Sequence, residues 1–167
     1  LFYGRFAEMV YNGDKTETEN CMKGVAMKVL VTGATGFLGK YVVEELAEQG
    51  YHVRAFGRNL KAGRQLEGPL VEFFAGDFTR EEEIFAACEG VDAVVHAGAL
   101  STIWGPWEQF YQTNVVGTKL VMEACRHFGV QRLVYISSPS VYAAARDQLA
   151  IKEEAAPQEN ELNFYIK

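Results

Sequence analysis

A glycine-rich turn between an apolar run and a helical pattern constrains the fold of this chain more than any other feature. The run Met27–Thr32 reads MKVLVT, and the segment Gly33–Gly39 that follows reads GATGFLG. The apolar run predicts a buried parallel strand. A strand that leads through glycines into a helix presents free N–H groups and the positive end of the helix dipole to an anion. We therefore predict a cradle for the pyrophosphate of a dinucleotide.

Each glycine of this segment has a predicted task. Gly33 turns the chain off the strand, Gly36 lets the backbone approach the phosphates, and Gly39 lets the new helix pack closely on the sheet. Plain turn chemistry is the alternative interpretation. The surroundings of the glycine segment favour the cradle, because a helical pattern follows it. Apolar residues recur at helical spacing before Gly50, namely Phe37, Leu38, Tyr41, Val42 and Leu46.

Strand and helix patterns alternate along the rest of the chain. Further strands are predicted at His52–Phe56, Val71–Ala75, Asp92–His96 and Arg132–Ile136, with helices at Arg80–Cys88 and from Phe110 onward. This alternation predicts the α/β class with a doubly wound parallel sheet. We expect one domain over residues 27–167, preceded by an N-terminal extension of unknown role over residues 1–26.

Composition limits the classes of function. The chain has 167 residues, of which 49% are hydrophobic, which is enough for a core. Its net charge of −6 argues against nucleic-acid binding. No apolar run reaches the roughly 18 residues of a membrane span. The three cysteines lack metal or redox spacing, so we expect no metal site and free thiols in the cytoplasm. The chain begins at Leu1 with no charged leader, and we expect it to be trimmed rather than targeted.

The spacing G-x-x-G-x-x-G resembles that of the extended short-chain dehydrogenase/reductase family, which includes nucleotide-sugar epimerases and dehydratases and 3β-hydroxysteroid dehydrogenases. The resemblance runs from about Met27 to the last residue and leaves out the first 26 or so. It implies a Rossmann fold that binds NAD(P), with Thr35, Phe37 and Leu38 in the cradle beside the three glycines. It also implies a C-terminal substrate lobe, which this chain does not include.

The end of the second strand carries the choice between NAD and NADP. Family members that use NAD place an acidic residue there to bind the ribose diol, and this chain has Gly57 followed by Arg58. A guanidinium binds a 2′-phosphate that a carboxylate would repel, so NADP is favoured over NAD. The alternative is that Arg58 is a solvated loop cation, with Lys61 and Arg64 adding to the local positive charge.

Two further strand ends are predicted to contact the cofactor. The resemblance places Asp77 and the N–H of Phe78 beside the adenine, although Asp77 could instead cap the helix Arg80–Cys88. After the fourth strand the small residues Ala97, Gly98 and Ala99 let the backbone lie flat against ribose and phosphates. His96 ends a buried strand, and we interpret it as structural rather than catalytic.

The loop 101–107 reads STIWGPW, and the residues after it include an Asn-Val-x-Gly-Thr run. This pattern resembles the 3β-hydroxysteroid dehydrogenase branch and bacterial reductases of long-chain β-keto acids. Thr102 and Trp104 are candidates for substrate contact, and aromatic core packing is the alternative for the tryptophans. The resemblance makes Asn114 a structural support and makes a homodimer through this helix plausible.

The segment after the fifth strand is predicted to carry catalysis. It reads SSPSVY over residues 137–142, and the resemblance assigns the catalytic hydroxyl to Ser138, with Ser137 facing the nicotinamide. A turn cap is the alternative role for these serines. Tyr165 resembles the acid/base of a Tyr-x-x-x-Lys pair whose Lys would lie two positions beyond Lys167. We expect the chain as given to be inactive alone, and a packing aromatic is the alternative for Tyr165.

Three functions remain open. The favoured one is hydride transfer between NADP(H) and a secondary alcohol or ketone, a small-molecule substrate, as in the 3β-hydroxysteroid dehydrogenase branch. A nucleotide-sugar epimerase or dehydratase shares the catalytic residues but favours NAD. A non-catalytic nucleotide-sensing domain is the third, which a true absence of the Lys would favour.

Overall fold

A computed structural model describes residues 27–142, 150–152 and 165. The predicted extension over residues 1–26 lies outside the described residues. The described chain forms a five-stranded parallel sheet in the order β3-β2-β1-β4-β5. Its strands are β1 (Lys28–Thr32), β2 (His52–Gly57), β3 (Val71–Ala75), β4 (Ala93–His96) and β5 (Arg132–Tyr135). The predicted doubly wound α/β fold is confirmed, and the strands begin and end within one residue of their predicted bounds.

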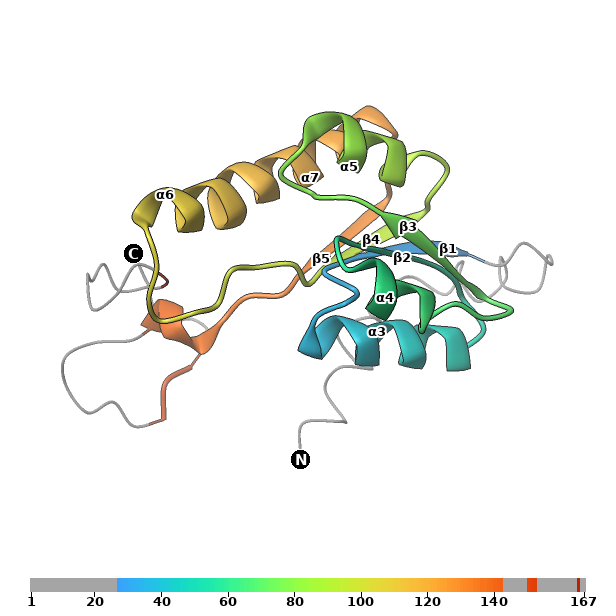
Figure 1. Cartoon of the computed structure of the whole chain (residues 1–167), viewed down its shortest axis with the longest axis horizontal. Coiled ribbons are helices and arrows are strands. Elements are labelled where there is room, and N and C mark those ends of the chain that lie inside the picture. Colours follow the sequence, from blue (N-terminus) through green and yellow to red (C-terminus); the bar gives the residue numbers. More distant parts are fainter. Residues whose placement is uncertain (1–26, 143–149, 153–164, 166–167) are drawn as a thin grey trace.

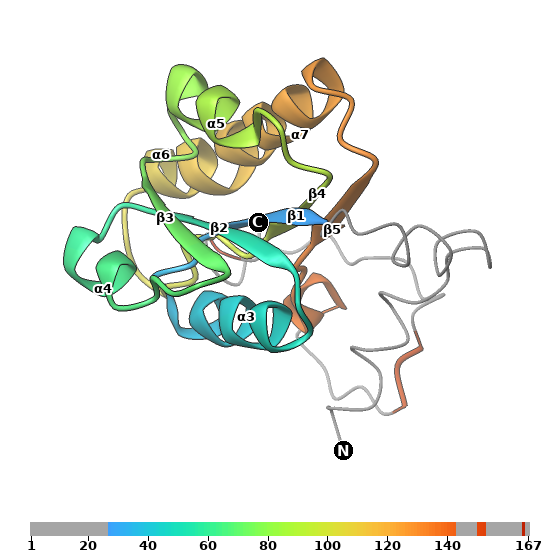
Figure 2. The same ribbon diagram turned by 90° about the vertical axis from the view of Figure 1, so that its right-hand side faces the viewer.

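Helices cover both faces of this sheet (Figures 1 and 2). α3 (Phe37–Glu48) and the short α4 (Leu60–Arg64) lie on one face. On the other face lie α5 (Glu81–Cys88) and one continuous helix made of α6 (Trp107–Phe110), a π-helical segment η1 (Tyr111–Gly117) and α7 (Thr118–His127). The long helix was predicted from Phe110 and begins one turn earlier. A 3-10 turn η2 (Pro139–Tyr142) follows β5.

The core has one half on each face of the sheet because side chains alternate along a strand. On the α5 and α7 side, Leu30 and Val94 pack with Ile84 and Val121. On the α3 side the buried cluster lies around Val31 and Val43, with Val29, Val53 and Ala55. The buried thiols Cys88 and Cys125 are free and belong to the first half.

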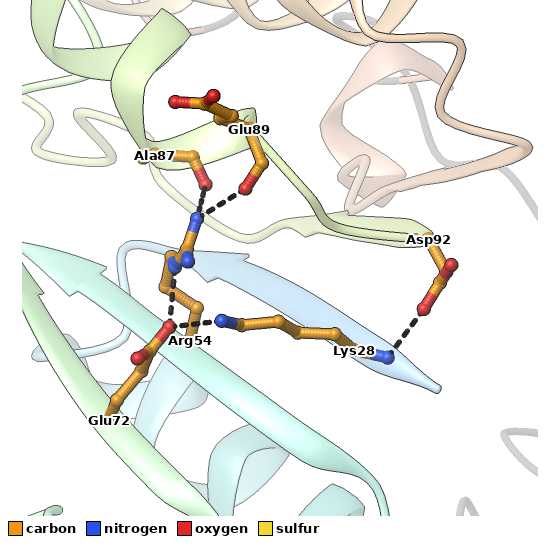
Figure 3. A network of polar contacts seen from close by, with 6 residues as sticks. All are labelled: Lys28, Arg54, Glu72, Ala87, Glu89 and Asp92. Carbon is orange, nitrogen blue, oxygen red and sulfur yellow. Dashed lines mark hydrogen bonds and ion pairs between the residues drawn. The ribbon is translucent and has the colours of Figure 1, made fainter. Parts of the chain in front are cut away.

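A polar network holds the end of α5 against the sheet, as Figure 3 shows. Arg54 donates Nη1–H to the carbonyl oxygens of Ala87 at 2.7 Å and Glu89 at 2.8 Å. Its Nε donates to Glu72 at 2.6 Å, and Glu72 also pairs with Lys28 at 2.7 Å. Hydrogen bonds and charges from Lys28 and Arg54 outweigh burial and lower the pKa of Glu72. The network therefore serves as a C-terminal clamp for α5.

Candidate functional site

The predicted site segments all follow the carboxyl ends of strands. Thr32, Phe56 and His96 are paired in register on neighbouring strands, and His96 is paired with Tyr135 of β5. The loops that follow these residues therefore leave the sheet at one edge. The strand order reverses between β1 and β4, and ligands of open α/β sheets bind in the crevice at such a switch point.

The turn after β1 is built on close backbone contacts. Gly33 has φ +68°, and a Cβ there would lie 2.6 Å from Cα of Gly98 in the loop after β4. A Cβ on Gly39 would collide with the carbonyl oxygen of Gly33. Gly39 therefore packs against the turn itself, a more local contact than the sheet packing that was predicted. Gly36 is exposed, and among the described residues a methyl group added there would meet only the Gly33 oxygen within 4 Å. The described part of the chain thus leaves the surface above Gly36 open to a ligand.

The start of α3 presents backbone rather than side chains to this surface. Gly36 is the N-cap residue, and within the described part of the chain no side chain caps this end of the helix. Phe37 is 83% exposed, and Leu38 and Tyr41 are also exposed, so the apolar spacing of this helix does not mark one buried face. Only Val42, Val43 and Gly39 of α3 are buried. Uncapped N–H groups and the helix dipole fit a pyrophosphate.

Gly57 at the end of β2 leaves room for Thr35. A Cβ on Gly57 would lie 2.8 Å from Thr35 Oγ1 and 3.1 Å from its methyl group. The space in which an acidic side chain would begin is thus occupied by the threonine of the glycine turn. The glycine at this position is a packing requirement of the turn, which the sequence pattern alone did not reveal.

Arg58 and Asp77 meet across the ends of β2 and β3. Arg58 Nη1 lies 3.4 Å from Asp77 Oδ2, and the other carboxylate oxygen accepts hydrogen bonds from the N–H and Oγ1–H of Thr79 at 2.9 and 2.8 Å. Burial raises the pKa of Asp77, but the Thr79 hydrogen bonds and Arg58 together lower it below its usual value. Arg80 is the N-cap of α5, so Asp77 stabilises the preceding turn instead of capping the helix. Arg58 is exposed but paired.

A chain of hydrogen bonds links β1, β4, the long helix and the loop after β4. His96 is buried, with Thr32 Oγ1 at Nδ1 and Thr118 Oγ1 3.1 Å from Nε2. Thr118 donates to the carbonyl of Asn114 at 2.7 Å, and the Asn114 side chain exchanges two hydrogen bonds with the backbone of Leu100, at 2.8 and 3.0 Å. Burial lowers the pKa of His96 to about 4. His96 and Asn114 thus have the structural surroundings that were predicted for them.

Phe78 packs inward beneath this loop. Its ring meets the His96 ring edge to face at 5.1 Å between centroids, and a Cβ on either Gly98 or Gly117 would lie within 2.6 Å of the Phe78 ring. Its side chain is therefore a support for the loop Ala97–Leu100, and a cofactor contact at Phe78 falls to its backbone N–H.

The substrate candidates project away from the core. Trp104 is 86% exposed, which rules out core packing for this tryptophan. Trp107 is exposed at the start of α6 and its ring lies 5.9 Å from that of Tyr111. Thr102 Oγ1 donates to the carbonyl of Trp104 at 3.2 Å, so it shapes the loop.

The catalytic candidates are only partly placed. Ser138 is partly buried, its Oγ accepts the N–H of Ser140 at 3.2 Å and donates to Ser140 Oγ at 3.0 Å, and Ser137 is exposed. Ser138 therefore does stabilise a turn, as the alternative role required. Tyr165 is partly buried, but the residues on both sides of it lie outside the described part of the chain.

The described residues support neither a metal site nor a membrane-spanning helix. No group of three His, Cys, Asp or Glu side chains there could hold a metal ion. In the same residues no helix is long and apolar enough to cross a membrane.

The sheet order and the glycine turn define a dinucleotide-binding α/β domain. Residues 29–166 match the model of the NAD dependent epimerase/dehydratase family, and the chain belongs to this family. It is 44% identical over 115 residues to a 2-alkyl-3-oxoalkanoate reductase of Stenotrophomonas maltophilia (strain K279a), covering 69% of this chain and 34% of that protein. It is 40% identical over 116 residues to the sterol-4-alpha-carboxylate 3-dehydrogenase, decarboxylating, of Mus musculus, covering 70% of this chain and 31% of that protein.

A UDP-glucose 4-epimerase of Thermus thermophilus in complex with NAD has a similar fold. The TM-score is 0.73 at 27% identity, covering 84% of this chain and 46% of that one. The chain thus spans about a third of the length of these curated relatives and under half of this solved structure. The family is that of NAD(P)-dependent oxidoreductases, and the resemblance to the extended short-chain dehydrogenases is confirmed.

Proposed function

We propose that the whole protein transfers a hydride between NADP(H) and a secondary alcohol or ketone. The observation that carries this proposal is that the glycine cradle and the segment containing Ser138 follow strands at one edge of a single sheet. The nicotinamide of the cofactor supplies the hydride donor or acceptor. Every other task falls to residues of the protein.

In this proposal two hydroxyl groups act on the substrate oxygen. Ser138 Oγ–H donates a hydrogen bond that stabilises negative charge on this oxygen, and the Tyr165 hydroxyl moves the proton. The resemblance pairs Tyr165 with a lysine four residues further along, whose positive charge would favour this proton transfer. Pro139 restricts the backbone directly after Ser138.

The preference for NADP over NAD is part of the proposal. Thr35 occupies the space in which an acidic side chain at Gly57 would begin, and Arg58 lies next along the chain. The similar solved structure named above and others carry NAD, so the preference depends on these residues of the chain.

An apolar substrate is proposed on two grounds. Ile103 and Trp104 are exposed, at 65% and 86%, in the loop after β4. The names of the two curated relatives refer to an oxoalkanoate and to a sterol, both largely hydrocarbon. Thr102 and Trp104 would contact such a substrate at the mouth of the site.

The test is NADPH consumption by the full-length protein with medium-chain 3-oxoalkanoates and with 3-oxosteroids. The proposal expects turnover with NADPH well above that with NADH. A nucleotide-sugar epimerase is the second candidate, favoured by the likeness to UDP-glucose 4-epimerase. That activity would interconvert a UDP-sugar with no net cofactor oxidation, and it would exclude the reductase.

A homodimer in the cytoplasm completes the proposal. Trp107, Tyr111 and Met122 are exposed apolar residues along the α6–η1–α7 helix, a surface that a second copy could cover. Sedimentation of the full-length protein should give a dimer, and Met122→Lys should shift it toward the monomer.

A further inference from the structure

We propose that Asp77 is a specificity-determining residue that restrains Arg58 and so limits the preference for the 2′-phosphate. The inference rests on the proposed function, since it assumes that the adenosine end of the cofactor lies at the ends of β2 and β3. It assigns to Asp77 a role toward Arg58 that is separate from any contact with the adenine.

The backbone brings the two residues together. Gly57 is paired with Ala75 at the ends of β2 and β3, and the N–H of Gly76 donates to the carbonyl of Gly57 at 3.1 Å. Arg58 and Asp77 therefore leave neighbouring strands side by side. Their ion pair, 3.4 Å between Nη1 and Oδ2, bridges the two loops that would flank the adenosine.

The Asp77 side chain is held more tightly than the Arg58 side chain. Asp77 is 22% exposed, its Oδ1 accepts two hydrogen bonds from Thr79, and its own N–H donates to Glu83 Oε2 at 2.7 Å. Arg58 is 76% exposed and bound to Asp77 through one nitrogen. A ligand that recruits the guanidinium will therefore move Arg58, while the Asp77 carboxylate stays in place.

The charges then decide whether Asp77 raises or lowers the affinity for NADPH. A 2′-phosphate brings about −1.5 to −2 charge, and its affinity for Arg58 must compete with the carboxylate that already holds this side chain. The fixed carboxylate also repels the phosphate directly. NADH carries a hydroxyl at this position and experiences neither term, so Asp77 lowers the affinity for NADPH selectively.

Asp77→Asn isolates this charge. The amide oxygen can still accept the Thr79 hydrogen bonds, so the turn is kept. Fluorescence titration of the full-length protein with NADPH and with NADH gives the two dissociation constants for the wild type, Asp77→Asn, Arg58→Met and the double variant. The matched control is Arg80→Met, which removes the exposed Arg80–Glu83 pair of 3.6 Å one turn away.

The inference predicts that Asp77→Asn raises the ratio of NADPH affinity to NADH affinity about three- to tenfold, as expected for removal of one partly exposed charge. Both cofactors carry the adenine, so a contact between Asp77 and the adenine changes both constants and cancels from this ratio. The gain should be at least halved in the Arg58→Met background, and Arg80→Met should leave both constants unchanged. If Arg58→Met weakens NADPH binding but Asp77→Asn does not raise the ratio of NADPH affinity to NADH affinity, the inference is overturned and the NADP preference stands. If Arg58→Met leaves NADPH binding unchanged, the NADP preference and the inference both fail.

Discussion

His96 Nε2 lies 3.1 Å from Oγ1 of Thr118, and this contact joins β4 to the long helix. Because the Thr118 hydroxyl donates its proton to the carbonyl of Asn114 at 2.7 Å, its oxygen is left to accept from His96. His96 is therefore the neutral tautomer with its proton on Nε2, and Nδ1 accepts from Thr32. The carbonyl that accepts from Thr118 belongs to Asn114 in the π-helical segment η1, and an α-helix would pair this carbonyl with the backbone N–H of Thr118.

Acid should destabilise the protein through His96. The unfolded chain binds a proton at this histidine near pH 6.5, while the buried ring does so only near pH 4. The unfolded state therefore binds more protons between these values, and stability falls as the pH is lowered through this window, by up to about 3 kcal/mol. Urea unfolding at several pH values measures the slope, which His96→Gln should flatten. His52→Gln, at an exposed position of β2, is the control and should leave the dependence of stability on pH unchanged.

Asn114→Leu should weaken NADPH binding. The substitution removes both hydrogen bonds that hold Leu100, and the loop Ala97–Leu100 lies directly beside the glycine turn. Buried backbone groups left unpaired cost about 1–3 kcal/mol, so we expect a loss of stability. We also expect the dissociation constant for NADPH to rise roughly tenfold. Gln112→Leu removes an exposed contact with Glu108 in the same helix and should change neither quantity. Equal affinities of the two variants would contradict the role of Asn114.

Gly39→Ala should damage the cofactor site more than the fold. The added methyl would meet the carbonyl of Gly33, which must shift and so displace the turn. We expect about 2 kcal/mol of destabilisation, as for overpacking elsewhere, and at least tenfold weaker NADPH binding. Gly68→Ala is the matched control, because no atom of the described residues lies within 4 Å of a methyl group there. Calorimetric titration compares the two, and normal NADPH affinity in Gly39→Ala would be evidence against the cradle.

Arg54→Met should lower stability and leave cofactor binding intact. It removes the donor shared by the carbonyls of Ala87 and Glu89, at a cost of about 2 kcal/mol. Arg80→Met removes an exposed pair and should cost less than about 0.5 kcal/mol. Thermal unfolding of both variants gives the comparison, and a similar small loss for each would show that the clamp is weak.

The fold was predictable because its signals are local. Continuous apolar runs predicted β1 and β4, and Gly50, which has φ +88°, marked the end of α3. The exposure of Phe37 and Tyr41 was not predictable from helical spacing, because spacing does not reveal which face meets the sheet. The π-helical segment was not predicted, because the spacing of apolar residues does not distinguish an α-helix from a π-helical turn.

The site was predictable as a set of strand ends but not as a set of pairings. Arg58 and Asp77 are 19 residues apart, and only the register of β2 with β3 brings them together. The partners of Gly33 and Gly57, namely Gly98 and Thr35, were likewise set by the approach of two loops. A basic residue one position after β2 and an acidic residue two positions after the adjacent β3 were the one signal that the sequence offered for the ion pair.

Transfer of deuterium from NADPH that carries two deuterium atoms at C4 to the product of the full-length protein tests the central claim most directly. We predict that deuterium appears on the carbinol carbon of the product formed from an apolar ketone. The Ser138→Ala, Tyr165→Phe double variant should lose at least about a thousandfold in rate while NADPH affinity stays the same. Full turnover by the double variant, or an alcohol product without deuterium, would contradict the account.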